Sequence, residues 1–397
     1  MDPTSMLDLA TRCVHGGRRA TPGDPDLAPP LRRATTFLQH PGTHAATDGG
    51  DFDGPLVYGR YASPNVVEVE AHVAGLEGAG ACVAFGSGMA ALHAALTCLV
   101  GHGRRVAVPR QVYGGTSALL ARELAECGIV ALTYDIEAPG TLERALAAGA
   151  TLVLAEGLSN PIVRVADLPD LAQRAHAHGA RLLVDSTFAS PIVQRPLEHG
   201  ADFVMHSATK ALGGHSDLLA GLLLGSAEDM DRVRGFRKRT GAVLDPAAAW
   251  LLTRGLATLA LRVRAQCAGA CRVAAALAAH PGVARVHHPS LPSDPGHARA
   301  QRLLASGLYG SVVSIELAAG DAATRPFVAA LHLLQDAPSL GGVESLASIP
   351  RVMSHAGWSE QELRAAGIGP GAVRLAIGIE DPGDLVADLL GALDALV

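Results

Sequence analysis

Short apolar runs rich in β-branched residues alternate along much of the chain with longer stretches of helical periodicity. These runs span residues 81–85, 105–108, 129–134, 151–155, 181–184, 203–205 and 218–224. Strands that alternate with helices in this way predict an α/β domain around a mostly parallel sheet. Polar and glycine residues cluster directly after several of the runs. Because ligands of open α/β sheets bind at the carboxyl ends of the strands, these clusters are candidate site segments.

The chain length and a change of pattern near residue 250 indicate more than one domain. One hydrophobic core rarely extends over 397 residues, so a large and a smaller domain are expected. Beyond residue 250, a helical stretch runs to about residue 279, and the alternating segment 312–317 follows. This second part therefore predicts a smaller α+β domain.

The first sixty residues have little periodicity and too few apolar residues to pack alone. They contain a proline-rich stretch, 22–30, and a glycine-bounded segment, 42–54, that we interpret as a loop. We interpret them as an arm that docks on a neighbouring subunit. The predicted organisation is an N-terminal arm at 1–60, an α/β domain at 61–250 and an α+β domain at 251–397.

Composition excludes several classes of partner. The net charge of −6 and the isoelectric point near 6.3 give no reason to expect binding to nucleic acid or an anionic membrane. The first thirty residues hold no apolar stretch of signal-peptide length, and no transmembrane run occurs, which predicts a soluble cytoplasmic protein. The six cysteines are scattered, as free thiols in a reducing compartment would be. Cys267 and Cys271 stand four residues apart without a further ligand pair, so we expect no metal.

Lys210 is a candidate reactive residue because lysine is so rare here. Only two of the 32 lysine and arginine residues are lysines. Arginine can replace lysine as a surface cation, but it neither loses its proton near neutral pH nor forms an imine. Lys210 follows an apolar run and precedes Gly213 and Gly214, as expected of a strand end that presents a side chain to a polar pocket. Lys238, between Arg237 and Arg239, is interpreted as part of a solvated basic cluster.

Two further motifs fit a common chemistry. The segment 85–91 contains a Gly-Ser-Gly turn that opens a helix, whose amides and dipole can hold a phosphate, although such turns often serve only close packing. Asp185 ends another apolar run, where it could equally be a turn or cap residue. Pyridoxal phosphate requires a lysine for its imine, an acid for its pyridinium nitrogen and a phosphate site. Lys210, Asp185 and the 85–91 turn could supply these three parts.

Four ordered motifs extend this interpretation to a family. Residues 112–116, 207–215, 339–346 and 373–380 resemble motifs of the Cys/Met-metabolism family of pyridoxal-phosphate enzymes, and the resemblance runs from Tyr58 to the C-terminus. The family includes cystathionine γ-lyase, methionine γ-lyase, cystathionine γ-synthase and the homoserine sulfhydrylases. The resemblance implies fold type I, with a mostly parallel seven-stranded sheet in a large cofactor-binding domain and a smaller C-terminal α+β domain.

The resemblance also implies roles for particular residues. Lys210 would bind pyridoxal 5'-phosphate and move protons, Asp185 would pair with the pyridine nitrogen, and Tyr113 would stack on the ring and protonate the departing γ-substituent. Arg374 would grip the substrate carboxylate, with Ser339 lining that site. The remaining implied contacts are Gly88, Met89, Ser207 and Thr209 at the phosphate, and Asn160 near the ring oxygen and the substrate.

Tyr58 and Arg60 match a pair that reaches across a dimer interface to the neighbour's phosphate. If they act so, a monomer has an incomplete site, and we expect a homo-oligomer, a dimer of catalytic dimers. The amino-acid substrate is then the only other expected partner.

Departures from the family pattern concern the substrate. Segment 62–65 and Ser186 differ from the usual residues near the cofactor. Pro338 stands where members that process cystathionine commonly carry an acid, which favours an uncharged side chain such as that of methionine. Gly115, however, stands where typical methionine γ-lyases carry cysteine, so the two signals conflict.

The predicted activity is γ-elimination. The enzyme would cleave the Cγ–S bond, or a similar γ-substituent bond, of a sulfur amino acid such as methionine or cystathionine. The products would be a 2-oxo acid, ammonia and a thiol. The alternative is γ-replacement of the cystathionine γ-synthase or homoserine sulfhydrylase type. A non-catalytic regulator that binds pyridoxal phosphate is a third possibility, against which Lys210, Tyr113 and Arg374 argue.

Overall fold

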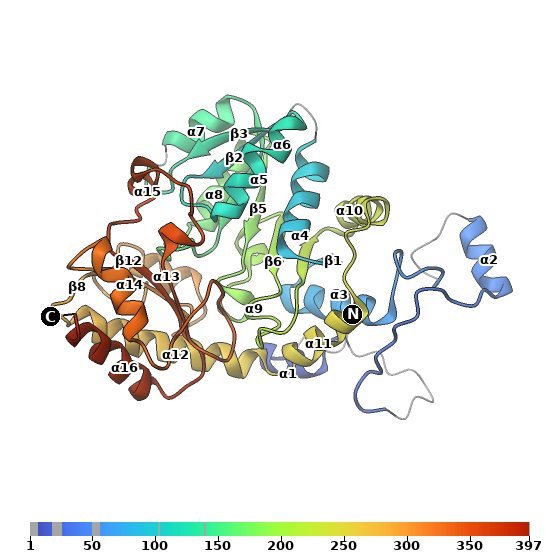
Figure 1. The fold of residues 1–397 in the computed structure, drawn as a ribbon. Helices are drawn as coiled ribbons and strands as arrows, with labels where there is room; N and C mark the ends of the chain where they lie inside the picture. Colours follow the sequence, from blue (N-terminus) through green and yellow to red (C-terminus); the bar gives the residue numbers. More distant parts are fainter. Residues whose placement is uncertain (1–6, 18–25, 50–55, 102–103, 139, 397) are drawn as a thin grey trace. The chain divides into compact units, whose positions relative to one another are not determined.

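The computed structural model describes residues 7–17, 26–49, 56–101, 104–138 and 140–396 (Figure 1). The chain divides into two compact units. The first unit comprises Met1–Cys98 and Met205–Leu259, and the second unit comprises Leu99–Val204 and Ala260–Val397. The division into 1–60, 61–250 and 251–397 stays a prediction.

The first unit surrounds three strands with helices. Its strands are β1 (Ala81–Phe85), β7 (Gly221–Gly225) and the end of β6 (Phe203–Ser207), in the order β1-β7-β6. Its helices are α1 (Leu9–His15), α2 (Pro41–Asp48), α3 (Pro64–Glu77), α4 (Gly88–Ala95), α10 (Ala227–Thr240) and α11 (Pro246–Leu256), and the π-helical turn η2 (Leu96–Val100) follows α4. β1 and β7 are antiparallel, and both are buried continuous apolar runs because helices cover them.

One prediction for the N-terminal segment is wrong. The segment 42–54, predicted as a loop, overlaps α2, which begins at Pro41. Proline suits the first helical position because its φ is already helical and its missing N–H is not needed there. No residue of α2 is buried, which explains why the helix carries no amphipathic signal. Residues 22–25 and 50–54 of the two predicted segments lie outside the described residues.

The second unit contains a parallel four-stranded arrangement and a separate small sheet. The parallel strands are β2 (Arg105–Pro109), β3 (Val130–Tyr134), β4 (Ala150–Glu156) and β5 (Arg181–Asp185), in the order β5-β4-β2-β3. The helical segments between them or after them are α5 (Gly114–Ala121), α6 (Glu123–Glu126), α7 (Gly140–Ala147), α8 (Leu168–Ala177), α9 (Ser190–Val193) and η3 (Pro196–His199). α7 and α8 pack beside the strands, as Figure 1 shows, over a core that consists mainly of alanine and leucine side chains.

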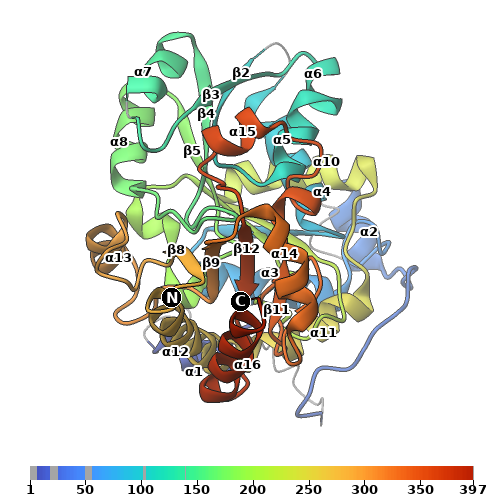
Figure 2. The same ribbon diagram turned by 60° about the vertical axis from the view of Figure 1, so that its left-hand side comes forward.

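The small sheet runs in the order β10-β11-β12-β9-β8. Its strands are β8 (Val283–His287), β9 (Val312–Leu317), β10 (Gln335–Asp336), β11 (Leu346–Ser348) and β12 (Ala372–Ala376). The accompanying helical segments are α12 (Leu259–Ala278), α13 (His297–Leu303), α14 (Asp321–Ala330), η4 (Pro350–Val352), α15 (Glu360–Ala365) and α16 (Pro382–Asp394). Figure 2 shows α14 and α16 beside β12 and β9, and the apolar faces of these elements form one core with α12.

The predicted α/β class, with a large, mostly parallel sheet and a smaller α+β part, is confirmed. The single helix predicted from residue 250 to about residue 279 is wrong, because α11 ends at Leu256 and α12 begins at Leu259. A Cβ on Gly255 would lie 2.3 Å from the carbonyl oxygen of Gly213, so only glycine permits this approach near the end of α11. In the described part of the chain, no helix has the length and apolar character that spanning a membrane needs.

Candidate active site

The predicted site residues fall into two groups, one in each unit. The first unit carries the following: Tyr58, Arg60, Gly88, Met89, Ser207, Thr209 and Lys210. The second unit carries the following: Tyr113, Asn160, Asp185, Ser339 and Arg374. Each group has its own geometry and chemistry.

The turn between β1 and α4 has the form of an anion site. The Ser87 hydroxyl caps α4 by accepting the N–H of Ala90 at 3.1 Å. Within the described part of the chain, the N–H groups of Gly88 and Met89 meet no acceptor, as usual for the first turn of a helix. These two donors stand at the positive end of the helix dipole, where a phosphate would be stabilised.

Ser207 packs directly on this turn. A Cβ on Gly88 would lie 2.8 Å from Cβ and 3.0 Å from Oγ of Ser207, so only glycine leaves room at this position. On the neighbouring strand, a Cβ on Gly221 would lie 2.0 Å from the carbonyl oxygen of Ser87. The two glycines therefore let the turn, β6 and β7 come close enough to bring the Ser207 hydroxyl beside the Gly88 amide.

Thr209 and Lys210 lie in a tight turn after β6. The Thr209 hydroxyl accepts the N–H of Ala220 at 3.0 Å and donates to its carbonyl at 3.3 Å. The backbone N–H of Lys210 donates to Ser207 at 3.1 Å, and the N–H of Gly214 donates to Lys210 at 2.8 Å. The turn thus fixes the backbone of Lys210. The Thr209 hydroxyl would have to exchange its bond to Ala220 before donating to a phosphate.

A buried pair missed in the sequence anchors β6. Nε2 of His206 lies 2.6 Å from Oε1 of Glu77, and both side chains are almost fully buried. Glu77 ends α3, so the pair ties that helix to the strand that carries Ser207. Its sequence signal is weak, because Glu77 is one of three glutamates in α3.

Tyr58 and Arg60 form a small cationic and aromatic cluster. The Arg60 guanidinium lies 5.7 Å from the ring centre of Tyr58 and 4.9 Å from that of Tyr61. It also donates to the backbone carbonyl of Lys238, whose Nζ lies 5.7 Å from the Tyr61 ring centre. Tyr58 remains 42% exposed. Lys238, interpreted as part of a solvated cluster, therefore lies beside Arg60.

In the second unit, the Tyr113 turn is held from two sides. Its N–H donates to Oε1 of Glu156 at 2.8 Å. A Cβ on Gly114 would lie 1.9 Å from the carbonyl oxygen of Ser354, so the turn packs against that loop without side-chain space. A Cβ on Gly115 would lie 2.5 Å from Cε1 of Tyr113, which shows that the ring occupies the space of a side chain at 115.

Arg374 is built as a fork for an anion. It lies on β12 and is buried, with Nη1 donating to Oδ1 of Asn160 at 3.2 Å and Nη2 to the carbonyl of Ser339 at 3.0 Å. Its buried Nε has no partner among the described residues. Burial lowers the pKa of Arg374 to about 10, so the guanidinium stays charged at neutral pH. Asn160 and Ser339 thus set the plane of the fork.

Asp185 ends β5, and its carboxylate accepts the N–H of Thr187 at 3.0 Å. Its neighbour in register on β4 is Glu156, a buried acid that sequence reasoning missed. Burial, with the nearby Asp185 charge, raises the pKa of Glu156 to about 8. The signal was available, because Glu156 ends an apolar run just as Asp185 does.

His355 is a second missed residue near this group. It is buried, and its ring lies edge-on to Trp358 with the ring centres 4.7 Å apart. Burial, together with the Arg374 charge, lowers the pKa of His355 to about 4, so the ring is neutral at physiological pH. His355 follows Ser354, the residue that packs on Gly114, and therefore supports the Tyr113 turn.

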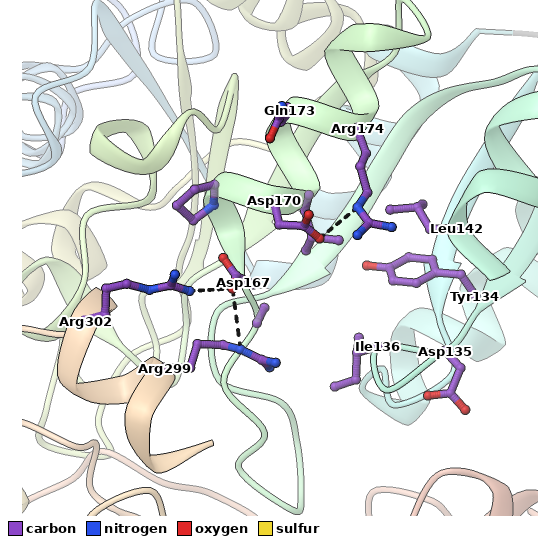
Figure 3. Close-up of a pocket in the computed structure, with 13 residues that line it drawn as sticks. Tyr134, Asp135, Ile136, Leu142, Asp167, Asp170, Gln173, Arg174, Arg299 and Arg302 are labelled. Atoms are coloured by element: carbon purple, nitrogen blue, oxygen red, sulfur yellow. Dashed lines mark hydrogen bonds and ion pairs between the residues drawn. The ribbon is translucent and has the colours of Figure 1, made fainter. Parts of the chain in front are cut away.

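The second unit also contains a cavity of about 450 Å³ (Figure 3). None of the predicted site residues lines it. Its arginines are already paired: Arg302 and Arg299 with Asp167 at 2.5 and 3.7 Å, and Arg174 with Asp170 at 2.8 Å. Because these charges are satisfied by neighbours, the cavity has no free cation for a substrate carboxylate. Among the described residues, no cluster of three or more His, Cys, Asp or Glu side chains could hold a metal ion.

Comparison with known proteins identifies the family. The family model described as Cys/Met metabolism PLP-dependent enzyme matches residues 10–394. The chain belongs to this family. L-methionine γ-lyase of Pseudomonas deceptionensis is 39% identical over 403 residues, which cover 100% of this chain and 99% of the relative. Cystathionine γ-synthase of Mycobacterium leprae is 37% identical over 391 residues, which cover 98% of this chain and 97% of the relative.

A solved structure of the family has the same fold. The cystathionine γ-synthase of Xanthomonas oryzae pv. oryzae, in complex with aminoacrylate and cysteine, superposes with a TM-score of 0.91 at 35% identity. The match covers 98% of each chain. The family assignment predicted from the motifs is therefore confirmed, and the cofactor is pyridoxal 5'-phosphate.

The residues of this chain fit that cofactor and an amino-acid substrate. The partnerless amides of Gly88 and Met89 suit a phosphate, and the partnerless Nε of Arg374 suits a carboxylate. The role of each predicted site residue stays a prediction.

Proposed function

We propose that this enzyme catalyses γ-elimination on a sulfur amino acid, releasing a 2-oxo acid, ammonia and a thiol. The observation that carries the proposal is the buried fork of Arg374, set by Asn160 and Ser339, with its Nε left for a ligand. Bidentate pairing with such a fork is how proteins hold planar carboxylates. An amino acid bound there would be anchored by its carboxylate.

Particular residues would hold the cofactor. When bound, pyridoxal phosphate supplies an electron sink for negative charge at the substrate α-carbon. Gly88, Met89 and Ser207 would bind its phosphate, with Thr209 as a further donor. Asp185 would hold the proton on the pyridine nitrogen.

Two residues would move protons. Lys210, once released from the cofactor, would take a proton from the α-carbon of the substrate, and this requires its neutral amine. Tyr113 would donate a proton to the sulfur of the departing group. Tyr113 is 37% exposed, while its backbone is fixed by Glu156, so the phenol can reach a ligand without moving its turn.

Pro338 bears on the substrate. It precedes Ser339, whose carbonyl holds Arg374, and it is exposed and uncharged. A substrate with a second ammonium group gains no attraction there, whereas an uncharged thioether loses nothing. This favours methionine over cystathionine. Gly115 argues against methionine, because the Tyr113 ring fills the space of a side chain at the position where methionine γ-lyases typically carry a cysteine.

The test is product analysis of the purified enzyme. Methionine, cystathionine, homocysteine and O-acylated homoserines would each be supplied with and without cysteine. Elimination predicts a 2-oxo acid and ammonia from at least one sulfur amino acid without cysteine. Cystathionine formed from an O-acylated homoserine only when cysteine is present would instead establish γ-replacement. The absence of turnover on all of them would leave a pyridoxal-phosphate-binding regulator.

A shared site between subunits is part of the proposal. Tyr58 and Arg60 would complete the phosphate site of a neighbouring chain in a homo-oligomer. Arg60→Ala and Lys210→Ala should each be inactive, yet a mixed dimer of the two should regain part of the activity. One of its sites then carries both defects, and the other carries neither. If mixed dimers form, as tags on the two chains would show, and no activity returns, Arg60 acts within its own chain.

A further inference from the structure

Glu156 joins two loops that carry predicted site residues. Its carboxylate lies at the end of β4 and accepts a backbone N–H with each oxygen, from Tyr113 at 2.8 Å and from Asn160 at 3.0 Å. Tyr113 lies 43 residues before Glu156 in the chain, and Asn160 lies 4 residues after it. The Glu156 side chain thus fixes the spacing of the two loops.

The connection continues from Asn160 to the substrate fork. Asn160 has its N–H bound to Glu156 and its side-chain oxygen bound to Arg374. Asn160 and Arg374 are both buried, at 6% and 4% exposure, so neither bond is exchanged freely with water. A shift of the Glu156 carboxyl group would therefore move the Tyr113 turn directly and would move Arg374 through Asn160.

The electrostatic setting of Glu156 is unfavourable for a purely structural carboxylate. It is 8% exposed, and its register partner across β4 and β5 is another acid, Asp185. Among the described residues, no ion pair includes Glu156. Ionising a buried carboxyl group without a cation nearby costs free energy, and the two N–H bonds offset that cost only in part.

We propose that Glu156 is a positioning residue for the active site, whose two-oxygen bridge sets Tyr113 and Asn160 relative to Asp185. The inference rests on the proposed function for the roles of those three residues, but not for the bridge itself. In this arrangement Glu156 touches neither substrate nor cofactor. It acts on the stacking of the Tyr113 ring and on the plane of the Arg374 fork.

The chemistry of the bridge makes glutamine a sharp test. Both oxygens of Glu156 accept N–H groups, and a glutamine has one oxygen and one NH₂ donor. Glu156→Gln preserves size but places a donor against one of the two backbone donors, so one loop must separate. Glu156→Asp keeps both carboxyl oxygens, but it is one methylene shorter and cannot reach both loops in their present positions.

Asp388 offers a matched control in the same unit. Its carboxylate also bridges two backbone donors, accepting the N–H groups of His332 at 2.9 Å and Leu333 at 3.0 Å. It lies on α16, and neither of these two hydrogen bonds involves a predicted site residue. Asp388→Asn therefore measures what loss of such a bridge does to stability alone.

The experiment compares the cofactor-loaded wild-type protein, Glu156→Gln, Glu156→Asp and Asp388→Asn. The first readout is visible circular dichroism per bound cofactor, which reports how the cofactor is oriented by its surroundings. The second is kcat/KM on whichever substrate the wild type turns over. We expect both Glu156 variants to change the dichroism and Glu156→Gln to lower kcat/KM on the order of 10- to 100-fold. Asp388→Asn should change neither readout.

Two results would overturn the proposal. One is dichroism and kcat/KM in Glu156→Gln equal to those of Asp388→Asn, which would make Glu156 only structural. If Glu156→Gln does not fold, Glu156→Asp decides alone, and wild-type dichroism in that variant would refute positioning. The dichroism needs only bound cofactor, so it still tests the bridge if the wild type proves to catalyse no γ-elimination. Failure of the proposed function would appear instead in the wild-type products.

Discussion

Replacing Lys210 with alanine should abolish turnover and the visible absorption band that comes from the lysine-bound form of the cofactor. That band requires the imine between a lysine amine and the cofactor, and no arginine can form this bond. The backbone of Lys210 is fixed by its bonds to Ser207 and Gly214, at 3.1 and 2.8 Å, and alanine keeps both. The variant should therefore fold and still bind the cofactor phosphate without forming the covalent bond. Absorption spectroscopy before and after dialysis measures this directly.

The other lysine supplies the control for this experiment. Lys238→Ala removes a cation but leaves the backbone carbonyl that accepts Arg60, so the cluster around Tyr61 should keep its arrangement. Its visible spectrum should match that of the wild type. If Lys238→Ala were colourless and Lys210→Ala retained its spectrum, the cofactor lysine would be Lys238, and the whole site assignment in the first unit would be wrong.

The fold was predictable because its local and long-range signals agree. The runs that become β1, β2, β4 and β5 are almost entirely buried, so they are nearly continuous in apolar residues, whereas β3 is mostly exposed. The break between α11 and α12 was not predictable from periodicity. It depends on the approach of Gly255 to the carbonyl of Gly213, which only tertiary packing creates.

The site was predictable where chemistry demands a residue type at a strand end. Lys210 and Asp185 both satisfy that condition. Glu156 satisfies it too, but its function lies in two backbone bonds that a sequence does not display. His355 carries no such signal, since its neutrality results from burial and from the Arg374 charge. The sequence therefore does not reveal the residues that position other site residues.

The position of the Tyr113 ring illustrates the same limit. From the sequence, Gly115 bears on the site only through the side chain that it lacks. In the structure the ring of Tyr113 lies over Gly115, so the glycine has a positive role in deciding where the ring rests. That role depends on the direction of a neighbouring side chain, which backbone and rotamer preferences alone do not determine.

Arg374→Ala should lower kcat/KM strongly while leaving the visible spectrum of the cofactor unchanged. Truncating one partner of a buried charge pair costs about 2 to 5 kcal/mol, largely because the other charge is left unpaired, which corresponds to a loss of about 30- to 4,000-fold. The bonds of Arg374 to Asn160 and Ser339 are to neutral acceptors, so the fold should lose less than the substrate does.

Arg374→Lys separates charge from geometry. Lysine keeps a cation but replaces the planar fork with a point charge, so it cannot bond Asn160, Ser339 and a carboxylate in the present arrangement. We expect its kcat/KM to lie between those of the wild type and Arg374→Ala, measured with the substrate that product analysis identifies. If Arg374→Ala showed wild-type kinetics, the substrate carboxylate would be held by another group. The partnerless Nε of Arg374 would then need a different ligand, and the amino-acid site would have to be sought elsewhere in the chain.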